Sequence, residues 1–213
     1  MKSFVSKLKE EFKKGLPGTE VQWFLASSDR LAKDFPRIPR HDSTEAAVLI
    51  LLYPVKGIVH TVFIQRPEYE GVHGGQISFP GGKKEPDDMD LLQTAYREAS
   101  EETGVNPGDM KIIGILTPLY IPVSNIVVTP YVGWSERKPL FTPEAKEVVF
   151  IIEADIRSFL DDSIIKIKPF EIRGELIDIK YFDYNGNTIW GATAMILYEL
   201  LTLIKRGNII AEV

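Results

Sequence analysis

The sequence contains no cysteine, only three histidines and no long apolar run. Without cysteine the chain cannot form disulfides or thiolate nucleophiles, so any metal would be bound by carboxylate, imidazole or carbonyl groups. A membrane-spanning helix needs roughly 18 to 20 consecutive apolar residues, and neither such a run nor an apolar signal-peptide centre occurs. We therefore expect a soluble protein of the cytoplasm that does not act at a membrane.

Basic residues are outnumbered as well, because 25 lysines and arginines stand against 30 aspartates and glutamates, for a net charge of -5. A nucleic-acid-binding protein usually presents a basic face, so nucleic acid is not an expected partner. A small anionic substrate is compatible with this charge if a cation lies between substrate and protein. The sequence leaves open whether the chain is a monomer or a homodimer.

The 213 residues, of which 44% are hydrophobic, are sufficient for one domain with additions. Phe4, Leu8 and Phe12 repeat every four residues, and Pro17 and Gly18 interrupt the pattern. We predict an N-terminal helical arm over residues 1–40, packed on a domain that covers residues 41–213.

The pattern then changes to that of strands. We predict strands at 46–53 and 60–65, joined by a turn at 54–57, and a short strand that ends at Pro80; further strands are expected to begin at Lys111, Ile126, Glu147 and Leu176. A closing helix is predicted from about Trp190 to Arg206. Together these elements predict an α/β fold in which helices cover a mixed sheet.

The segment from Leu91 to Thr103 is predicted to be a helix. Asp90 with Gln93 resembles a capping box, and Gly104 stands where helices commonly end. The predicted apolar stripe consists of Leu91, Leu92, Ala95, Tyr96 and Ala99. On the same wheel Glu98 and Glu102 fall at the edge of the stripe, and Glu101 lies further round.

Two carboxylates that lean toward a core repel each other and are costly to desolvate, so positive charge is expected beside them. Arg97 can reach Glu101 four residues on. A hard divalent cation would supply the rest, since magnesium commonly binds one or two carboxylates together with substrate phosphates. The glycines of "SFPGGKKEPDD", ahead of the helix, would let the backbone approach a ligand closely.

Loop and helix together, "GGKKEPDDMDLLQTAYREASEETGV", resemble the Nudix box. The half from Arg97 to Val105 matches at each signature position, whereas the acid position of the first half falls on Met89 because the loop is one residue longer. This longer loop and the preceding "QRPEYEGVHGGQISFPGG" are similar to the coenzyme A pyrophosphatase subgroup, with Pro67, Glu70 and Gly71 as departures.

The resemblance implies a Nudix-type α/β/α sandwich over residues 41–213 and hydrolysis of a diphosphate linkage with Mg²⁺ or Mn²⁺. The implied substrate is coenzyme A or an acyl-coenzyme A, cleaved to 3′,5′-ADP and (acyl-)4′-phosphopantetheine. The implied metal ligands are Glu98, Glu101, Glu102 and the carbonyl of Gly81, and the implied catalytic residues are these glutamates with Arg97 and Glu147.

Arg66, His73 and Lys83 are candidates for binding the substrate, because they stand next to the resembling motif and carry or can accept positive charge. Two alternatives stay open. The first is hydrolysis of another nucleoside diphosphate derivative, such as a nucleotide sugar or ADP-ribose. The second is a non-catalytic module that binds a ligand, although such a module has no chemical need for all three glutamates.

Overall fold

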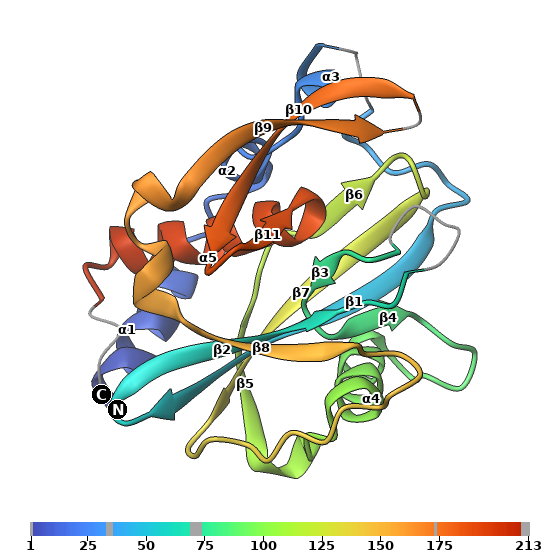
Figure 1. Ribbon diagram of the computed structural model, residues 1–213. Coiled ribbons are helices and arrows are strands. Elements are labelled where there is room, and N and C mark those ends of the chain that lie inside the picture. The colour runs from blue at the N-terminus through green and yellow to red at the C-terminus, as the bar shows by residue number, and fades with distance from the viewer. Residues whose placement is uncertain (1, 33–35, 69–73, 173, 210–213) are drawn as a thin grey trace.

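The computed structural model describes residues 2–32, 36–68, 74–172 and 174–209 (Figure 1). The helices are α1 (Lys2–Lys13), α2 (Thr19–Trp23), α3 (Ser28–Ala32), α4 (Leu91–Thr103) and α5 (Gly191–Arg206), with 3-10 turns η1 (Pro107–Asp109), η2 (Ile156–Phe159) and η3 (Asp162–Ile164). The strands are β1 (Thr44–Val55), β2 (Ile58–Gln65), β3 (Ile77–Ser78), β4 (Gly81–Lys83), β5 (Met110–Ile115), β6 (Leu119–Ile121), β7 (Ile126–Ser135), β8 (Phe150–Asp155), β9 (Ile165–Ile172), β10 (Glu175–Tyr184) and β11 (Asn187–Trp190). None of the helices within these ranges is both long and apolar enough to cross a membrane.

The main sheet has eight strands with the order β3-β2-β1-β7-β5. Strand β4 pairs with β1, β6 pairs with β7, and β8 pairs with β2. Strands β1 and β7 run parallel, while the other neighbours are antiparallel. The prediction of a mixed sheet is therefore confirmed.

Strand β1 lies at the centre of this sheet and is buried on both faces, because successive side chains of a strand point to opposite sides. Ala47, Leu49 and Leu51 pack in the cluster that contains residues of α4. Ile50 and Leu52 belong to the larger cluster that contains residues of α1 and α5. Helices thus cover the sheet from both sides, as the predicted α/β/α sandwich requires.

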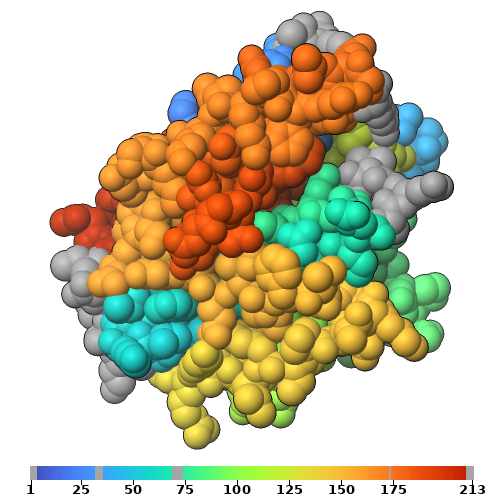
Figure 2. All heavy atoms as spheres, viewed as in Figure 1, coloured from blue at the N-terminus to red at the C-terminus, as the bar shows by residue number. Residues whose placement is uncertain are grey.

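A three-stranded sheet, β9 to β11, lies with the N-terminal helices on the α5 side of the main sheet (Figure 1). Helix α2 packs on α5, and α3 packs on β10. Strand β11 lies beside β3, and Figure 2 shows the second sheet next to β3 on the surface. This layer brings the N-terminal and C-terminal segments close to the loop in front of α4.

Helix α4 has the predicted bounds. The Asp90 side chain accepts a hydrogen bond from the Gln93 amide, and Gly104 ends the helix with φ 74°. The reciprocal bond differs from a capping box, since Gln93 accepts from the amide of Met89. These caps fix where the glutamates of the helix lie.

The strand predicted to begin at Glu147 is wrong at its start, because β8 begins at Phe150. Glu147 lies in a turn, where its amide donates to the Glu144 carbonyl at 3.0 Å. Pairing with β2 starts only where the Val149 amide reaches the Gln65 carbonyl at 2.9 Å. Glu147 therefore belongs to an exposed loop ahead of the strand.

Candidate active site

The site forms where β4 runs past α4. Strand β4 pairs with β1 through Val48 opposite Gly81 and Ala46 opposite Lys83, and α4 packs on both strands. Of the three glutamates, Glu102 has a side chain 4% exposed, Glu98 16% and Glu101 52%. The helical wheel therefore placed them correctly, with two carboxylates against the sheet and one toward solvent.

Glu102 is held by the strand end in front of the helix. Its Oε2 accepts a hydrogen bond from the Gly81 amide at 2.8 Å, and Arg66 Nη2 lies 3.5 Å from its Oε1. Burial raises the pKa of the Glu102 carboxyl to about 7, and Glu98 and Glu147 add to the rise, although Arg66 and the Gly81 amide oppose it. The negative charge at this position is thus incompletely compensated within the protein.

Glu98 faces the backbone of β4, one turn earlier on α4. A Cβ atom on Gly82 would overlap the Glu98 carboxylate, so the glycine is what allows this close approach. Arg97 Nη1 donates to Glu98 Oε1 at 3.0 Å. Burial raises the pKa of Glu98 despite this contact, and the neighbouring Glu101 contributes in the same direction.

Arg97 anchors the carboxylates to the loop. Its Nη1 donates to Glu101 Oε2 at 3.1 Å, which confirms the predicted contact. Its Nε and Nη2 donate to the two oxygens of Asp88 at 3.1 and 3.0 Å, and this fork raises the pKa of Arg97 and holds that of Asp88 well below its usual range. Asp88 is buried, whereas Met89, to which the motif count assigned the acid position, is 86% exposed.

Asp88 is the site residue that the sequence reasoning missed. A signal existed, because a loop one residue longer than the motif can place the acid one residue earlier. The Asp88 side chain also accepts from the Glu85 amide and the Thr94 hydroxyl, both at 2.9 Å. It therefore ties the loop, the helix and Arg97 together.

Arg66, predicted to bind substrate, lies against protein groups instead. Its Nε donates to the Ser78 hydroxyl at 3.1 Å, and its Nη2 donates to the Gly81 carbonyl at 2.7 Å. The Gly81 carbonyl, predicted as a metal ligand, is thus the acceptor of an arginine in this structure. Arg66 supports the turn and Glu102 together.

The other predicted site residues lie around this centre or outside the described ranges. Lys83 is exposed at the end of β4, and its carbonyl accepts from Arg97 Nη2 at 3.1 Å. Glu147 is exposed and near enough to Glu102 to influence its pKa. His73 lies outside the residues that the structure describes, as do Glu70 and Gly71.

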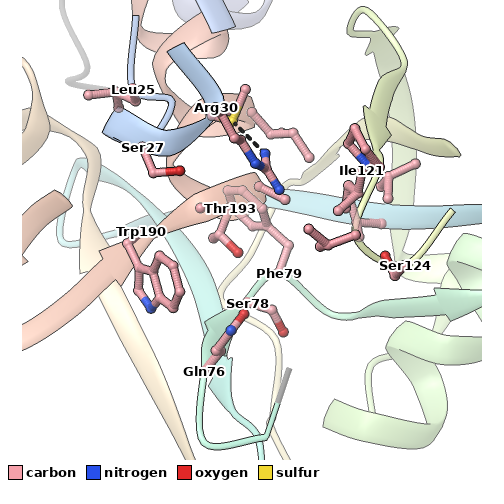
Figure 3. Close-up of a pocket in the computed structure, with 18 of the residues that line it drawn as sticks. Leu25, Ser27, Arg30, Gln76, Ser78, Phe79, Ile121, Ser124, Trp190 and Thr193 are labelled. Atoms are coloured by element: carbon pink, nitrogen blue, oxygen red, sulfur yellow. Dashed lines mark hydrogen bonds between the residues drawn. The ribbon is translucent and has the colours of Figure 1, made fainter. Parts of the chain in front are cut away.

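A cavity of about 970 Å³ opens beside Gly81 and Gly82 (Figure 3). One side consists of residues of β1, β3 and β4, including Ser78, together with Arg66, which directly follows β2. The remaining walls come from the N-terminal helices, the segment 121–124, strand β10 and the start of α5. Sequence reasoning did not find this cavity, because its walls come from segments that only the fold brings together.

The carboxylates suit a hard divalent cation in their chemistry. Glu102 is buried and Glu98 is partly buried, burial raises the pKa of both carboxyls, and both lie beside the glycine turn. As the side chains stand, however, the described residues contain no group of three or more carboxylates or imidazoles arranged to hold a metal ion. Glu98 and Glu101 are turned toward Arg97, and Glu102 toward Gly81 and Arg66.

Comparison with known proteins gives consistent matches. The model of the NUDIX domain matches residues 43–156. The chain is 34% identical to "Nudix hydrolase 22, chloroplastic" of Arabidopsis thaliana over 167 residues, which are 75% of this chain and 55% of that protein. It is 32% identical to "Uncharacterized Nudix hydrolase NudL" of Pectobacterium atrosepticum over 171 residues, 78% of this chain and 86% of that protein.

The chain thus spans little more than half the length of the plant relative and most of the bacterial one. Among solved structures, the Nudix hydrolase RenU of M. smegmatis is similar with a TM-score of 0.54 at 12% identity, over 77% of this chain and 87% of that one. At that identity the likeness concerns the fold. The matched domain contains β1 to β8 and α4, but neither the N-terminal helices nor the segment from β9 to α5.

Proposed function

Because the chain belongs to the Nudix hydrolase family, whose reaction is hydrolysis of a diphosphate linkage, we propose that its substrate is coenzyme A or an acyl-coenzyme A. The products would be 3′,5′-ADP and (acyl-)4′-phosphopantetheine. The observation that carries the proposal is the incompletely compensated pair Glu98 and Glu102, which lie against the cavity-lining residues Gly81, Gly82 and Arg66. The resemblance of the loop Gly81 to Asp88 to the coenzyme A subgroup favours this substrate.

In the reaction, one water adds to one phosphorus, the bridging P–O bond breaks, and two phosphate monoesters leave. Members of the family use divalent cations, and we propose Mg²⁺ or Mn²⁺ here, held by Glu98 and Glu102 with Glu101 and the Gly81 carbonyl as further ligands. When bound, the cation neutralises diphosphate oxygens and lowers the pKa of a coordinated water.

The protein groups around these ligands would orient them. Asp88 fixes the Arg97 guanidinium, and Arg97 in turn holds Glu98 and Glu101 in position. Arg66 holds the turn carbonyl of Gly81 and compensates part of the charge on Glu102. Positioning of this kind matters because small displacements of reacting groups cost large factors in rate.

Three more residues have proposed roles around this centre. Glu147, on the exposed loop ahead of β8, would act as an additional catalytic acid near Glu102. Lys83 would attract the anionic substrate at the edge of the cavity. His73 would bind the substrate, because it stands in the sequence stretch that resembles the coenzyme A subgroup. We also propose the cytoplasm as the location.

The test is a comparison of kcat/KM for coenzyme A, 3′-dephospho-coenzyme A, ADP-ribose and a nucleotide sugar, with Mg²⁺ and with Mn²⁺, and with products identified by mass. We expect coenzyme A to be the best substrate and to be cut within its diphosphate. A preference for ADP-ribose of tenfold, about 1.4 kcal/mol of transition-state stabilisation, would exclude coenzyme A while leaving diphosphate hydrolysis in place. Absence of turnover with every compound would favour the ligand-binding alternative.

A further inference from the structure

The cavity has two halves of different origin. Arg66, Gly81 and Gly82, next to the glutamates, lie within the matched NUDIX domain. The other half comes from Leu25 and Arg30 of the N-terminal segment and from residues of β9, β10, β11 and α5, all outside that domain. The part of the site remote from the chemistry therefore comes from segments that lie outside the matched domain.

The walls of this second half are mainly apolar. They include Leu25, Ile177, Ile179, Trp190, Met195 and Ile196. Such walls suit an uncharged part of a ligand, whereas any charged group needs a specific partner there. Figure 3 shows that Arg30 extends into the cavity across from Gln76 and Ser78.

Arg30 offers that partner. Its Nη1 donates to the Met195 sulfur at 3.6 Å, and a thioether is a weak acceptor for a group with five N–H donors. Among the described residues Arg30 forms no ion pair within 4.0 Å. Asp29, which also lines the cavity, accepts from the Ser27 hydroxyl at 2.5 Å. Burial lowers the pKa of Arg30, and the negative charge of the neighbouring Asp29 opposes this shift without cancelling it.

The other cations of the cavity are engaged or solvated. Arg66 holds Ser78 and Gly81. Lys180 donates to the Phe24 carbonyl at 2.8 Å, and its ammonium lies 4.3 Å from the centre of the Phe24 ring. Lys83 is exposed, so water can satisfy its ammonium. Arg30 is thus the cavity cation with donors still available for an anion.

We propose that Arg30 binds the 3′-phosphate of the nucleotide half of the substrate, so that the N-terminal segment completes the substrate site. The assignment rests on the proposed function, because it takes coenzyme A as the ligand. Charge decides between the two halves of that molecule: the pantetheine arm is uncharged, while the ribose carries a phosphate monoester. A guanidinium can bind such a group through two parallel hydrogen bonds.

Binding without turnover tests the proposal on the full chain. The probes are 3′,5′-ADP and 5′-AMP, which differ by the 3′-phosphate alone, and calorimetry gives both values of Kd. The wild type should bind 3′,5′-ADP at least about tenfold more tightly, the factor expected for one charge-assisted contact. Arg30→Gln should abolish this preference and leave the Kd of 5′-AMP unchanged.

The matched control is Arg37→Gln. Arg37 lies in the same segment, pairs with Glu20 at 2.8 Å and stacks on Trp23, but it does not line the cavity. This variant should keep the full preference.

If Arg30→Gln does not fold, Arg30→Met serves instead, since an apolar chain suits the surrounding walls. A preference that survives either Arg30 variant, or no preference in the wild type, overturns the proposal.

Kinetics separate this proposal from the proposed function. In the wild type kcat/KM should favour coenzyme A over 3′-dephospho-coenzyme A, and Arg30→Gln should remove that difference. If coenzyme A is not turned over but the 3′,5′-ADP preference depends on Arg30, the proposed function fails and the phosphate site stands. If Arg30→Gln instead removes a preference for succinyl- over acetyl-coenzyme A, the cavity holds the acyl arm and the phosphate assignment is wrong.

Discussion

The buried position of the Glu102 carboxylate destabilises the folded state when the group is ionised. It is almost fully buried, and its pKa of about 7 reports that ionisation inside the protein is harder than in water. Its contacts with the Gly81 amide and Arg66 reduce this cost without removing it. A buried residue whose charge destabilises the fold, although nearby groups donate hydrogen bonds to it, is typical of a functional position.

Replacing Glu102 by glutamine should therefore separate activity from stability. Glu102→Gln removes the charge, keeps nearly the same volume and leaves an oxygen that can accept from Gly81. We expect kcat to fall at least about 100-fold, because loss of this proposed metal ligand would weaken charge stabilisation worth several kcal/mol. The melting temperature should stay the same or rise.

The control is Glu136→Gln, a change at an exposed position at the end of β7 that should alter neither quantity. Steady-state kinetics and calorimetric melting measure both effects. A folded Glu102→Gln protein with the kcat of the wild type would contradict the assigned role.

For individual residues, the sequence predicted the orientation of the glutamates but not that Asp88 would bind Arg97. The helical wheel depends only on the regular geometry of α4, so the exposure of Glu98, Glu101 and Glu102 could be inferred. The position of Asp88 depends on the path of an irregular loop, where one added residue changes which side chain faces the helix. Regular elements carry their own geometry, whereas loops take theirs from the fold.

Among the elements, the fit between β4 and α4 decides where the glutamates lie. Gly81 and Gly82 are adjacent in sequence but are surrounded differently. A Cβ on Gly81, which has φ 153°, would overlap the Ala47 carbonyl oxygen and the Val48 backbone. A Cβ on Gly82 would overlap only the carboxylate end of Glu98 among its nearest neighbours.

Alanine should consequently affect mainly stability at position 81 and mainly activity at position 82. Gly81→Ala is expected to lower the free energy of unfolding by about 2–4 kcal/mol, because a strained backbone and a rigid neighbour must both adjust. Gly82→Ala should cost less stability but lower kcat at least about tenfold, since the flexible Glu98 side chain gives way. Urea unfolding and kinetics distinguish the two; full activity in Gly82→Ala would show that the position of Glu98 is not critical.

The secondary structure was predictable where the hydrophobic pattern is strong. Strands β1 and β2 and helix α4 each bury one or two faces, and the hydrophobic pattern of their sequences matches the observed burial. Strand β9 was not predicted. It is an edge strand with alternate residues exposed, and it contains Pro169, which a central strand would not tolerate. Its register is set by β10.

For the molecule as a whole, the N-terminal segment takes part in the main core. Phe4 packs against Trp134 at a ring distance of 5.9 Å, and Arg206 of α5 donates to Glu11 of α1 at 2.7 Å. The sequence predicted an amphipathic arm but could not indicate what it covers, because the contact partners lie far away in the chain. We propose that residues 1–40 are an integral layer of the domain over residues 41–213.

Glu199 of α5 provides a direct test of whether the N-terminal segment is an integral layer of the domain. It is fully buried, and its Oε1 accepts from the Gly18 amide at 3.0 Å and the Thr117 hydroxyl at 2.6 Å. Its Oε2 accepts from Gln22 Nε2 at 2.8 Å and the Thr117 amide at 3.1 Å. All four partners donate, so a carboxylate satisfies them and an amide cannot.

In Glu199→Gln the new NH₂ group would face two donors, and those donors would lose their acceptor. We expect the free energy of unfolding to fall by about 2–4 kcal/mol, because each buried donor left unsatisfied costs about 1–3 kcal/mol. Glu20→Gln, at an exposed position on the neighbouring α2, should stay within about 0.5 kcal/mol of the wild type. Urea unfolding followed by tryptophan fluorescence and by far-UV circular dichroism should give one shared transition in the wild type, since a common core unfolds as a unit. Two separate transitions, or a Glu199→Gln protein as stable as the Glu20→Gln control, would mean that the N-terminal segment is an independent attachment.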